Sequence, residues 1–218
     1  MLHGTIAGGT LTKRLIVAPH ADDEALGCGG LIAKYPDECS VVVLSDKDDG
    51  RLDEFFRAQK TLGYKSTTIC PFKTGELAAR SREVTTMLDS VISDLRPDVL
   101  YIPTPGAHQD HIAAYEAGIR AARLSYTDSA WFVPTVLLYE VPSYATDLYT
   151  IPYPWSRYEF LTEEQMDLKV AAINEYGSQT NGAFSPGDMA RAHATYIGAK
   201  CGNGYAEQYA VVREIVGY

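Results

Sequence analysis

Three apolar stretches in the first half of the chain are continuous rather than alternating, and they constrain the fold more than any other feature. They are rich in isoleucine, valine, leucine and tyrosine, which is typical of parallel strands that are covered on both faces. Two shorter apolar stretches are also expected to be strands. The five predicted strands are Arg14–Pro19, Ser40–Ser45, Ser66–Cys70, Asp98–Thr104 and Thr135–Val141. The first, second and fourth of these are the continuous ones.

Segments with helical spacing lie between the strands. Between residues 80 and 95, for example, Val84, Leu88 and Ile92 fall on one stripe, and Pro97 ends the helix. The predicted helices are Glu24–Tyr35, Leu52–Leu62, Arg80–Leu95, His111–Leu124 and Thr162–Tyr176. This alternation implies right-handed crossovers. We therefore predict the α/β class, with a Rossmann-like, doubly wound, mostly parallel sheet that is flanked by helices.

The C-terminal third has a different character. Residues 139–161 are rich in proline, tyrosine and tryptophan and are predicted to form a long irregular loop. The spacing of Thr162 and Gln165 predicts a capping box, and the glycine-rich residues 177–205 are expected to include one more helix. We expect a single domain over residues 1–218, with the part from about 142 to 218 covering the site. A purely structural cover over the sheet edge is the alternative.

The composition excludes some classes of function. A formal net charge of -9 disfavours a nucleic-acid partner, and no stretch approaches the ~20 apolar residues that a membrane span needs. The N-terminus shows no signal-peptide pattern. The four cysteines have no CxxC spacing, so we expect reduced thiols and a cytoplasmic location. Assembly into a homo-oligomer is compatible with all these features.

Charged side chains follow the first predicted strand directly. The strand Arg14–Pro19 runs into His20, Asp22 and Asp23, and a packed core does not tolerate such groups without partners. One alternative is that Asp22 or Asp23 caps the following helix. A bound metal is the other way to resolve the conflict.

A second polar cluster follows the fourth predicted strand and contains His108, Asp110 and His111. In doubly wound sheets, ligands bind beyond the carboxyl ends of the strands, near the point where the strand order reverses. Three of the five histidines of the chain therefore fall at two strand ends that are expected to be neighbours. The spacing of His108 and His111 allows both side chains to share one helix face.

The two clusters together are suited to metal-dependent hydrolysis. Two imidazoles and one carboxylate form a zinc site that leaves a position open for water. Such a metal polarises a carbonyl group, and a second carboxylate then acts as the general base. Asp22 and Asp23 are suited to divide these two tasks between them. The donor set favours Zn²⁺ but also accepts Fe²⁺ and other divalent transition metals.

Both clusters lie in motifs that resemble a known family. The segments "PHADDEALGCGG" and "HQDH" are similar to the first and second motifs of the LmbE-like or N-acetylglucosaminyl-phosphatidylinositol de-N-acetylase (PIG-L) family. The segments "RLDEFFRAQKTLG", "KVAAINEYGSQ" and "GAKCGNGYAEQY" are also similar to family sequences, so the likeness covers most of the chain. The resemblance implies a zinc-dependent hydrolase that removes the N-acetyl group from an N-acetylglucosamine-type amino sugar. That substrate belongs to a glycan, a glycolipid or a small glycoside.

The resemblance also implies roles for individual residues. His20, Asp23 and His111 bind the zinc ion, and Asp22 is the base that activates water and then protonates the leaving amine. His108 stabilises the oxyanion or assists as an acid.

The resemblance assigns further residues to supporting roles. It implies that Asp110 orients the catalytic histidine of the second motif, whereas Glu24 supports the site or starts a helix and is no ligand. Where some members of the family have a tyrosine, this chain has Gly106, so an oxyanion role for such a tyrosine does not carry over. Ala21 replaces the usual proline of the first motif.

Two arginines are candidates for substrate binding. Arg51 is suited to a phosphate, a carboxylate or a sugar hydroxyl, and a salt bridge to Glu54 is the alternative. The C-terminal family signature often begins with Arg-Gly, whereas this chain has Ile197-Gly198. Arg191 is therefore the candidate replacement, with a solvated helix position as its alternative.

Three other hypotheses remain to be compared with deacetylation. The first is a metal-dependent amidase that acts on another amide, such as a thiol conjugate. The second is a non-catalytic sugar-binding or nucleotide-binding module, although the GxGxxG fingerprint is absent and "GCGG" lies inside a helix, where it permits close packing. The third, a serine hydrolase, lacks the GxSxG elbow. The aromatic residues that are predicted either to stack on the substrate or to pack within the long loop are Tyr149, Tyr153, Trp155 and Tyr158.

Overall fold

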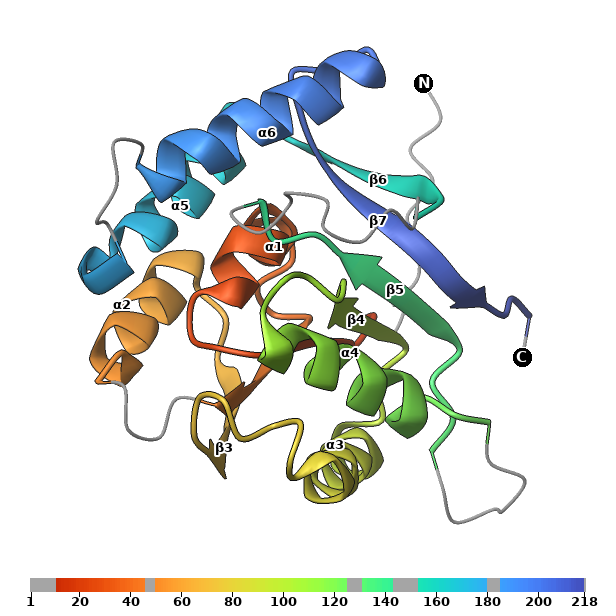
Figure 1. Cartoon of the computed structure of the whole chain (residues 1–218). Helices are drawn as coiled ribbons and strands as arrows, with labels where there is room; N and C mark the ends of the chain where they lie inside the picture. The colour runs from red at the N-terminus through yellow and green to blue at the C-terminus, as the bar shows by residue number, and fades with distance from the viewer. Residues whose placement is uncertain (1–10, 46–49, 125–130, 143–152, 180–184, 218) are drawn as a thin grey trace.

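A single seven-stranded sheet forms the centre of the computed structural model, which describes residues 11–45, 50–124, 131–142, 153–179 and 185–217. The strand order is β3-β2-β1-β4-β5-β7-β6 (Figure 1). Strands β1 to β5 are parallel to one another, and β7 is antiparallel to both β5 and β6. The strands are β1 (Arg14–Ala18), β2 (Cys39–Ser45), β3 (Ser66–Phe72), β4 (Val99–Pro103), β5 (Thr135–Tyr139), β6 (Trp155–Leu161) and β7 (Tyr205–Glu214).

Helices cover both faces of this sheet. The helices of the described residues are α1 (Asp23–Lys34), α2 (Leu52–Leu62), α3 (Ser81–Leu95), α4 (Gln109–Ala121), α5 (Glu163–Asn174) and α6 (Pro186–Lys200). Helices α3 and α4 pack on one face, and the other four gather on the opposite side (Figure 1). Ile16 and Ala18 belong to the core beneath α1 and α2, whereas Leu15 and Val17 belong to the core beneath α3 and α4. Because both faces are buried, the strand sequences are continuously apolar, as expected.

The predicted α/β class and the mostly parallel sheet are confirmed. The five predicted strands and five predicted helices correspond to β1–β5 and α1–α5, and the largest shift of a boundary is at the end of α4, at Ala121 rather than Leu124. The capping box at the start of α5 is present, because Thr162 Oγ1 accepts from the Gln165 backbone N–H at 3.3 Å. The Gln165 side chain accepts from the Thr162 N–H at 2.9 Å.

Two strands contradict the prediction for the C-terminal third. Residues 155–161, predicted to be part of an irregular loop, form the edge strand β6, and residues 205–214, for which no strand was predicted, form β7. Strand β6 has no continuous apolar run, because most of its residues are only partly buried. In β7, the buried Glu207 and Gln208 interrupt the apolar pattern. Tertiary contacts pair the Glu207 carboxylate with backbone N–H groups of α1 and the Gln208 amide nitrogen with Glu140, and a local sequence pattern does not contain such contacts.

The carboxylate of Glu207 joins β7 to the helix that carries the first motif. Its two oxygens accept hydrogen bonds from the backbone N–H groups of Gly30 and Leu31 in α1, each at 2.8 Å. Lys169 Nζ of α5 lies 2.6 Å from Oε1, and both side chains are almost fully buried. A buried charge is stable only when it is paired and hydrogen-bonded. This network therefore fixes α1, α5 and β7 relative to one another.

The glycines of "GCGG" allow α1 to approach the sheet closely. A Cβ atom on Gly27 would lie 2.2 Å from Cδ2 of Tyr139 in β5. A Cβ atom on Gly30 would lie 2.3 Å from Cδ1 of Leu161 in β6 and 3.0 Å from Oε1 of Glu207. No side chain larger than hydrogen fits at either position without displacing a buried group, so these glycines permit close packing, as the sequence indicates.

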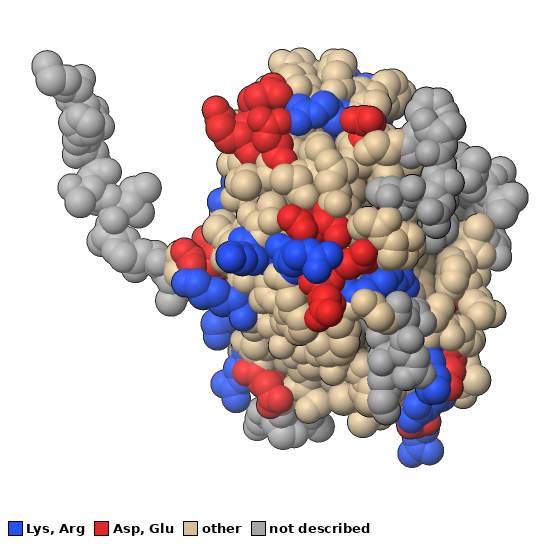
Figure 2. All heavy atoms as spheres, turned by 90° about the vertical axis from the view of Figure 1, so that its left-hand side faces the viewer, with Lys and Arg blue, Asp and Glu red and all other residues tan. Residues whose placement is uncertain are grey.

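The surface of the molecule carries charges of both signs. On the face shown in Figure 2, lysine and arginine side chains lie among aspartate and glutamate side chains and do not form a continuous basic area. Among the described residues, no helix has the length and apolar character that crossing a bilayer would require.

The buried ion pair leads to a prediction about stability. Replacing Lys169 with Met leaves the Glu207 carboxylate buried without its cation, so the free energy of unfolding in urea is expected to fall by about 3–5 kcal/mol. The double variant Lys169→Met/Glu207→Gln removes both charges and is expected to recover part of this loss.

The exposed ion pair between Arg123 and Asp89, whose side chains are 60% and 37% exposed, provides the matched control. Replacing Arg123 with Met is expected to change the free energy of unfolding by less than about 1 kcal/mol. Equal losses for the buried and exposed pairs would contradict the role given to Glu207.

Candidate metal centre and active site

The two predicted clusters meet where the strand order reverses. The chain places β2 and β3 on one side of β1 and then crosses to β4 on the other side. His20 follows β1, whereas His108 and His111 lie at the start of α4, after β4. Because β1 and β4 are parallel neighbours, their carboxyl ends lie at the same edge of the sheet. This edge is where ligands bind in doubly wound folds.

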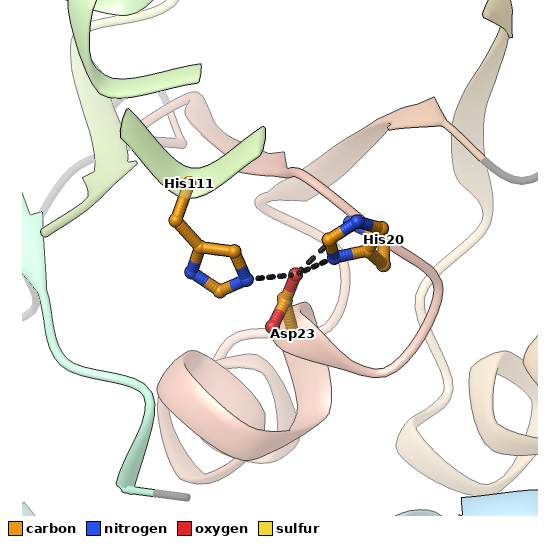
Figure 3. Close-up of side chains that lie close together, drawn as sticks. All are labelled: His20, Asp23 and His111. Carbon is orange, nitrogen blue, oxygen red and sulfur yellow. Dashed lines mark hydrogen bonds and ion pairs between the residues drawn. The ribbon is translucent and has the colours of Figure 1, made fainter. Parts of the chain in front are cut away.

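The carboxylate of Asp23 lies between two imidazole rings (Figure 3). Its Oδ2 atom is 3.3 Å from His20 Nδ1, 3.3 Å from His111 Nε2 and 2.9 Å from the backbone nitrogen of His20, which donates to it. The other oxygen, Oδ1, is buried and has no hydrogen-bond partner among the described residues. The side chains of all three residues are almost fully buried.

This arrangement has the spacing of a metal site. One ligand atom from each of His20, Asp23 and His111 lies within 4.8 Å of the others. Ligand atoms on a tetrahedral zinc ion lie about 3.4 Å apart, because each is about 2.1 Å from the metal. Two imidazoles, one carboxylate and an unsatisfied buried oxygen therefore fit a divalent transition metal.

The electrostatics of the cluster favour positive charge. Burial lowers the pKa of His20, but the hydrogen bonds to Asp110 and Asp23 and the charges of Asp23 and Asp22 outweigh burial and raise it to about 10. Burial raises the pKa of Asp23, but the charge and hydrogen bond of His111, together with His20, hold it well below its ordinary value. A cation between these carboxylates is therefore stable, and a divalent metal supplies one.

Asp110 makes its carboxylate contact with His20. Its Oδ2 atom is 3.2 Å from His20 Nε2 and accepts from the Gly75 backbone N–H at 2.6 Å. A carboxylate on the second nitrogen of a metal-binding imidazole fixes the ring orientation and raises its basicity. The expectation from the family was that Asp110 orients His108 instead. In the structure, the backbone N–H of Asp110 donates to His108 Nδ1 at 3.2 Å, whereas its carboxylate contacts His20.

His108 is arranged as a neutral hydrogen-bond donor. Burial and the charge of His20 lower its pKa below the ordinary value. Because Nδ1 accepts a hydrogen bond, the neutral ring carries its proton on Nε2. The ring centroid of His108 lies 4.7 Å from that of His20 and 5.8 Å from that of His111.

Asp22 lies beside the cluster in an unusual backbone conformation. Its φ is 135°, in the positive region that side chains rarely adopt. It occupies the position before α1, yet its side chain makes no capping hydrogen bond. Burial and the charge of Asp23 raise the pKa of Asp22 well above its ordinary value, and the charge of Arg51 opposes them. The Asp22 carboxylate is therefore oriented toward the site rather than used to cap the helix.

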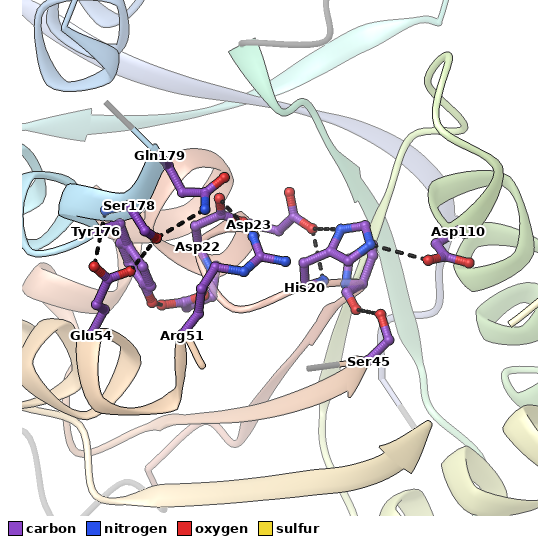
Figure 4. Close-up of polar contacts among 12 residues, drawn as sticks. His20, Asp22, Asp23, Ser45, Arg51, Glu54, Asp110, Tyr176, Ser178 and Gln179 are labelled. Carbon is purple, nitrogen blue, oxygen red and sulfur yellow. Dashed lines mark hydrogen bonds and ion pairs between the residues drawn. The ribbon is translucent and has the colours of Figure 1, made fainter. Parts of the chain in front are cut away.

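Arg51 approaches this carboxylate from the start of α2. Its Nη1 atom lies 3.5 Å from Asp22 Oδ2 (Figure 4). The alternative partner, Glu54, accepts hydrogen bonds instead from Oγ and the backbone N–H of Ser178, at 2.6 and 3.0 Å. Ser178 belongs to η2 (Gly177–Gln179), a 3-10 turn after α5. Because Glu54 pairs with Ser178, the Arg51 side chain is directed toward Asp22, the candidate base.

Arg191 lies outside this group of residues. Its guanidinium on α6 forms ion pairs with Glu163 and Asp167 of α5 and lies against the ring of Tyr205. These contacts correspond to the structural alternative for Arg191. The substrate-binding role of Arg191 stays a prediction, and its guanidinium has two carboxylates of α5 as partners in this structure.

Two buried side chains near the site were not singled out as a pair by the sequence. Tyr176 donates its hydroxyl proton to Glu24 Oε1 at 2.7 Å. Glu24 Oε2 accepts from the backbone N–H of Asp22 at 3.1 Å. The acid in the first turn of α1 and the tyrosine of "KVAAINEYGSQ" were the available signals. Their contact spans 152 residues of sequence, so no local pattern contains it.

The aromatic residues of the C-terminal third have separate surroundings. Tyr153 and Trp155 are partly buried and pack against the core beneath α3 and α4, with ring centroids 5.8 Å apart. Tyr158 donates to the backbone oxygen of Trp155 at 3.0 Å. These are packing contacts within the protein. Tyr149 lies outside the described residues.

Comparisons of the sequence with known proteins identify deacetylases as relatives. The deacetylase YaiS of Escherichia coli, named as uncharacterized, is 27% identical over 179 residues, which cover 75% of this chain and 90% of YaiS. The diacetylchitobiose deacetylase of Thermococcus kodakarensis is 28% identical over 224 residues, which cover 89% of this chain and 81% of that enzyme.

Comparisons of structure extend the likeness of the fold to almost the whole chain. The conserved protein TT1542 of Thermus thermophilus superimposes with a TM-score of 0.78 and 24% identity, covering 95% of this chain and 97% of that one. The 4-carboxy-2-hydroxymuconate hydratase GalB of Pseudomonas putida gives a TM-score of 0.75 and 19% identity, covering 95% and 99%.

The family comparison covers the part of the chain that holds the metal cluster. The family model described as GlcNAc-PI de-N-acetylase (PIG-L) matches residues 15–122. This range runs from β1 to the end of α4 and includes His20, Asp22, Asp23 and His111. The chain therefore contains a domain of the PIG-L/LmbE-like family.

Proposed function

We propose that this chain is a zinc-dependent N-deacetylase that hydrolyses the acetamido group of an N-acetylglucosamine-type amino sugar. The observation that carries the proposal is the buried group of His20, Asp23 and His111 at the point where the strand order reverses. Asp22 lies beside this group, and its carboxylate makes no capping hydrogen bond to α1. Curated relatives that are named deacetylases support the reaction class. The name of one of them, diacetylchitobiose deacetylase, supports an amino-sugar substrate.

His20, Asp23 and His111 would hold the metal, with Asp110 orienting the first of these ligands. When bound, a divalent metal supplies Lewis acidity toward the amide carbonyl and lowers the pKa of water. Zn²⁺ suits two imidazoles and one carboxylate, and Fe²⁺ is the second candidate for the same donors.

The other side chains then carry the proton transfers of amide hydrolysis. Asp22 accepts a proton from the attacking water, and its raised pKa suits it to deliver that proton to the departing amine. His108 donates from Nε2 to the oxygen of the tetrahedral intermediate. The C–N bond breaks as the amine is protonated, so one amide and one water yield acetate and a free amino sugar.

Arg51 is suited to a dual role in this site. Its charge holds Asp22 closer to its ionised form, which a general base requires. A guanidinium group is also suited to bind a hydroxyl or phosphate group of a substrate. A cytoplasmic location also belongs to the proposal, because the four cysteines are free thiols.

The fold alone does not select this reaction, because the structurally similar GalB is a hydratase. Two outcomes compete with sugar deacetylation: hydrolysis of another amide and ligand binding without catalysis. A substrate panel separates them. Acetate release is expected from N,N'-diacetylchitobiose and from GlcNAc glycosides, and not from N-acetylated amino acids. The reverse selectivity would identify a different amidase, and a protein that holds metal but is inactive on every amide would favour a binding module.

Replacing His111 with Ala tests the metal centre. Elemental analysis of the wild-type protein is expected to find about one metal ion per chain, and the variant is expected to lose it. Because the metal contributes several kcal/mol of transition-state stabilisation, acetate release falls by about a thousandfold. His193→Ala is the matched control, since this histidine pairs with Glu140. Metal retained in the His111 variant would disprove the assignment of the ligand.

Replacing Asp22 with Asn tests the base separately from the metal. The variant is expected to keep its metal and its fold, with kcat lower by about a hundred- to ten-thousandfold and a small change in KM. Asp53→Asn, an exposed position in the first turn of α2, is the matched control. An Asp22 variant with wild-type kcat would exclude this carboxylate as the base.

A further inference from the structure

The conformation of Asp22 needs a physical explanation. A φ of 135° is strained for a residue with a side chain, and strained conformations persist only where surrounding contacts hold them. The side chain of Asp22 does not supply such a contact to its own helix, since it forms no capping hydrogen bond. The contact that restrains the backbone must therefore come from another residue.

Glu24 provides this contact. Its side chain turns back along the first turn of α1, and Oε2 accepts from the Asp22 backbone N–H at 3.1 Å. The peptide that carries this N–H directly precedes the strained Cα of Asp22. Glu24 is completely buried, so its carboxylate has no bulk water with which to exchange this bond.

Tyr176 fixes the orientation of Glu24. Its hydroxyl donates to Oε1 at 2.7 Å, so both oxygens of the Glu24 carboxylate accept hydrogen bonds. Tyr176 is itself buried and lies just after α5. The next turn, η2, is attached to α2 through the hydrogen bonds of Ser178 to Glu54. The C-terminal third of the chain thus reaches the backbone of Asp22 through two hydrogen bonds in series.

We propose that Glu24 and Tyr176 are positioning residues that hold Asp22 in its strained conformation and aim its carboxylate into the site. This inference rests on the proposed role of Asp22 as general base. Neither residue touches the substrate. A displacement of about 1 Å in a catalytic group costs up to about a hundredfold in rate, so a contact that acts only on the backbone has a large kinetic effect.

Three variants test the pair. Glu24→Ala removes both hydrogen bonds, Tyr176→Phe removes one, and Glu24→Gln keeps an acceptor for Asp22 and a donor for the tyrosine oxygen. We expect kcat to fall at least about tenfold in Glu24→Ala and about threefold in Tyr176→Phe. Metal content and KM are expected to stay near wild type. Glu24→Gln is expected to recover most of kcat.

Tyr35→Phe is the matched control for the loss of a hydroxyl. Tyr35 donates to Glu159 Oε1 at 3.2 Å at the far end of α1, and its variant is expected to keep wild-type kinetics. Wild-type kcat in Glu24→Ala would overturn the proposal. Equal losses in Glu24→Ala and Glu24→Gln would overturn it too, because positioning requires rescue by the amide. Loss of metal together with activity would place Glu24 in the metal site instead.

A crystal structure of Glu24→Ala decides the question even if the wild-type protein releases no acetate. Relaxation of φ at Asp22 away from 135° would support the positioning role whatever the reaction is. An unchanged φ would contradict it. If Glu24→Ala does not fold, the same measurement on Tyr176→Phe decides.

Discussion

The contact of one buried carboxylate with two imidazoles is the interaction on which the site depends. Asp23 Oδ2 lies at the same distance, 3.3 Å, from His20 Nδ1 and His111 Nε2. A buried carboxylate is stable only with positive charge or hydrogen-bond donors around it, so the two motifs cannot separate without a large cost. The parallel pairing of β1 and β4 supplies the required proximity. The strand order therefore determines the candidate metal site, because its reversal between β1 and β4 brings the polar side chains of the two motifs together.

A second buried charge holds the scaffold of this site. Glu207 in β7 accepts two backbone N–H groups of α1 and the ammonium group of Lys169, so the antiparallel end of the sheet is joined to the helix that begins at Asp23. The hydrogen bonds of Tyr176 to Glu24 and of Ser178 to Glu54 similarly connect the segment after α5 to α1 and α2. The C-terminal third thus supports the N-terminal motifs from two directions, although the family match ends at residue 122.

The elements and clusters that local patterns describe were predictable. Continuous apolar runs identified β1, β2 and β4, because strands covered on both faces have no polar side. The two histidine-containing motifs were predictable as partners, since both follow parallel strands. Strand β7 was not, because Glu207 resembles a solvated residue until Lys169 and α1 surround it. The partner of the Asp110 carboxylate was not predictable either, because it is the distant His20 and not His108, the neighbour in sequence, which accepts from the Asp110 backbone N–H.

The sequence by itself determined the α/β class, the positions of the two polar motifs and the types of donor atom they contain. Periodicity and residue chemistry are local properties, so they can be identified from the sequence alone. Only the tertiary structure decided which polar side chains pair with one another. It directed Asp110 to His20, Glu54 to Ser178, Arg191 to α5 and Glu24 to Tyr176. The physical reason is that a buried charge takes the partner that packing brings nearest in space, and that partner is often distant in the chain.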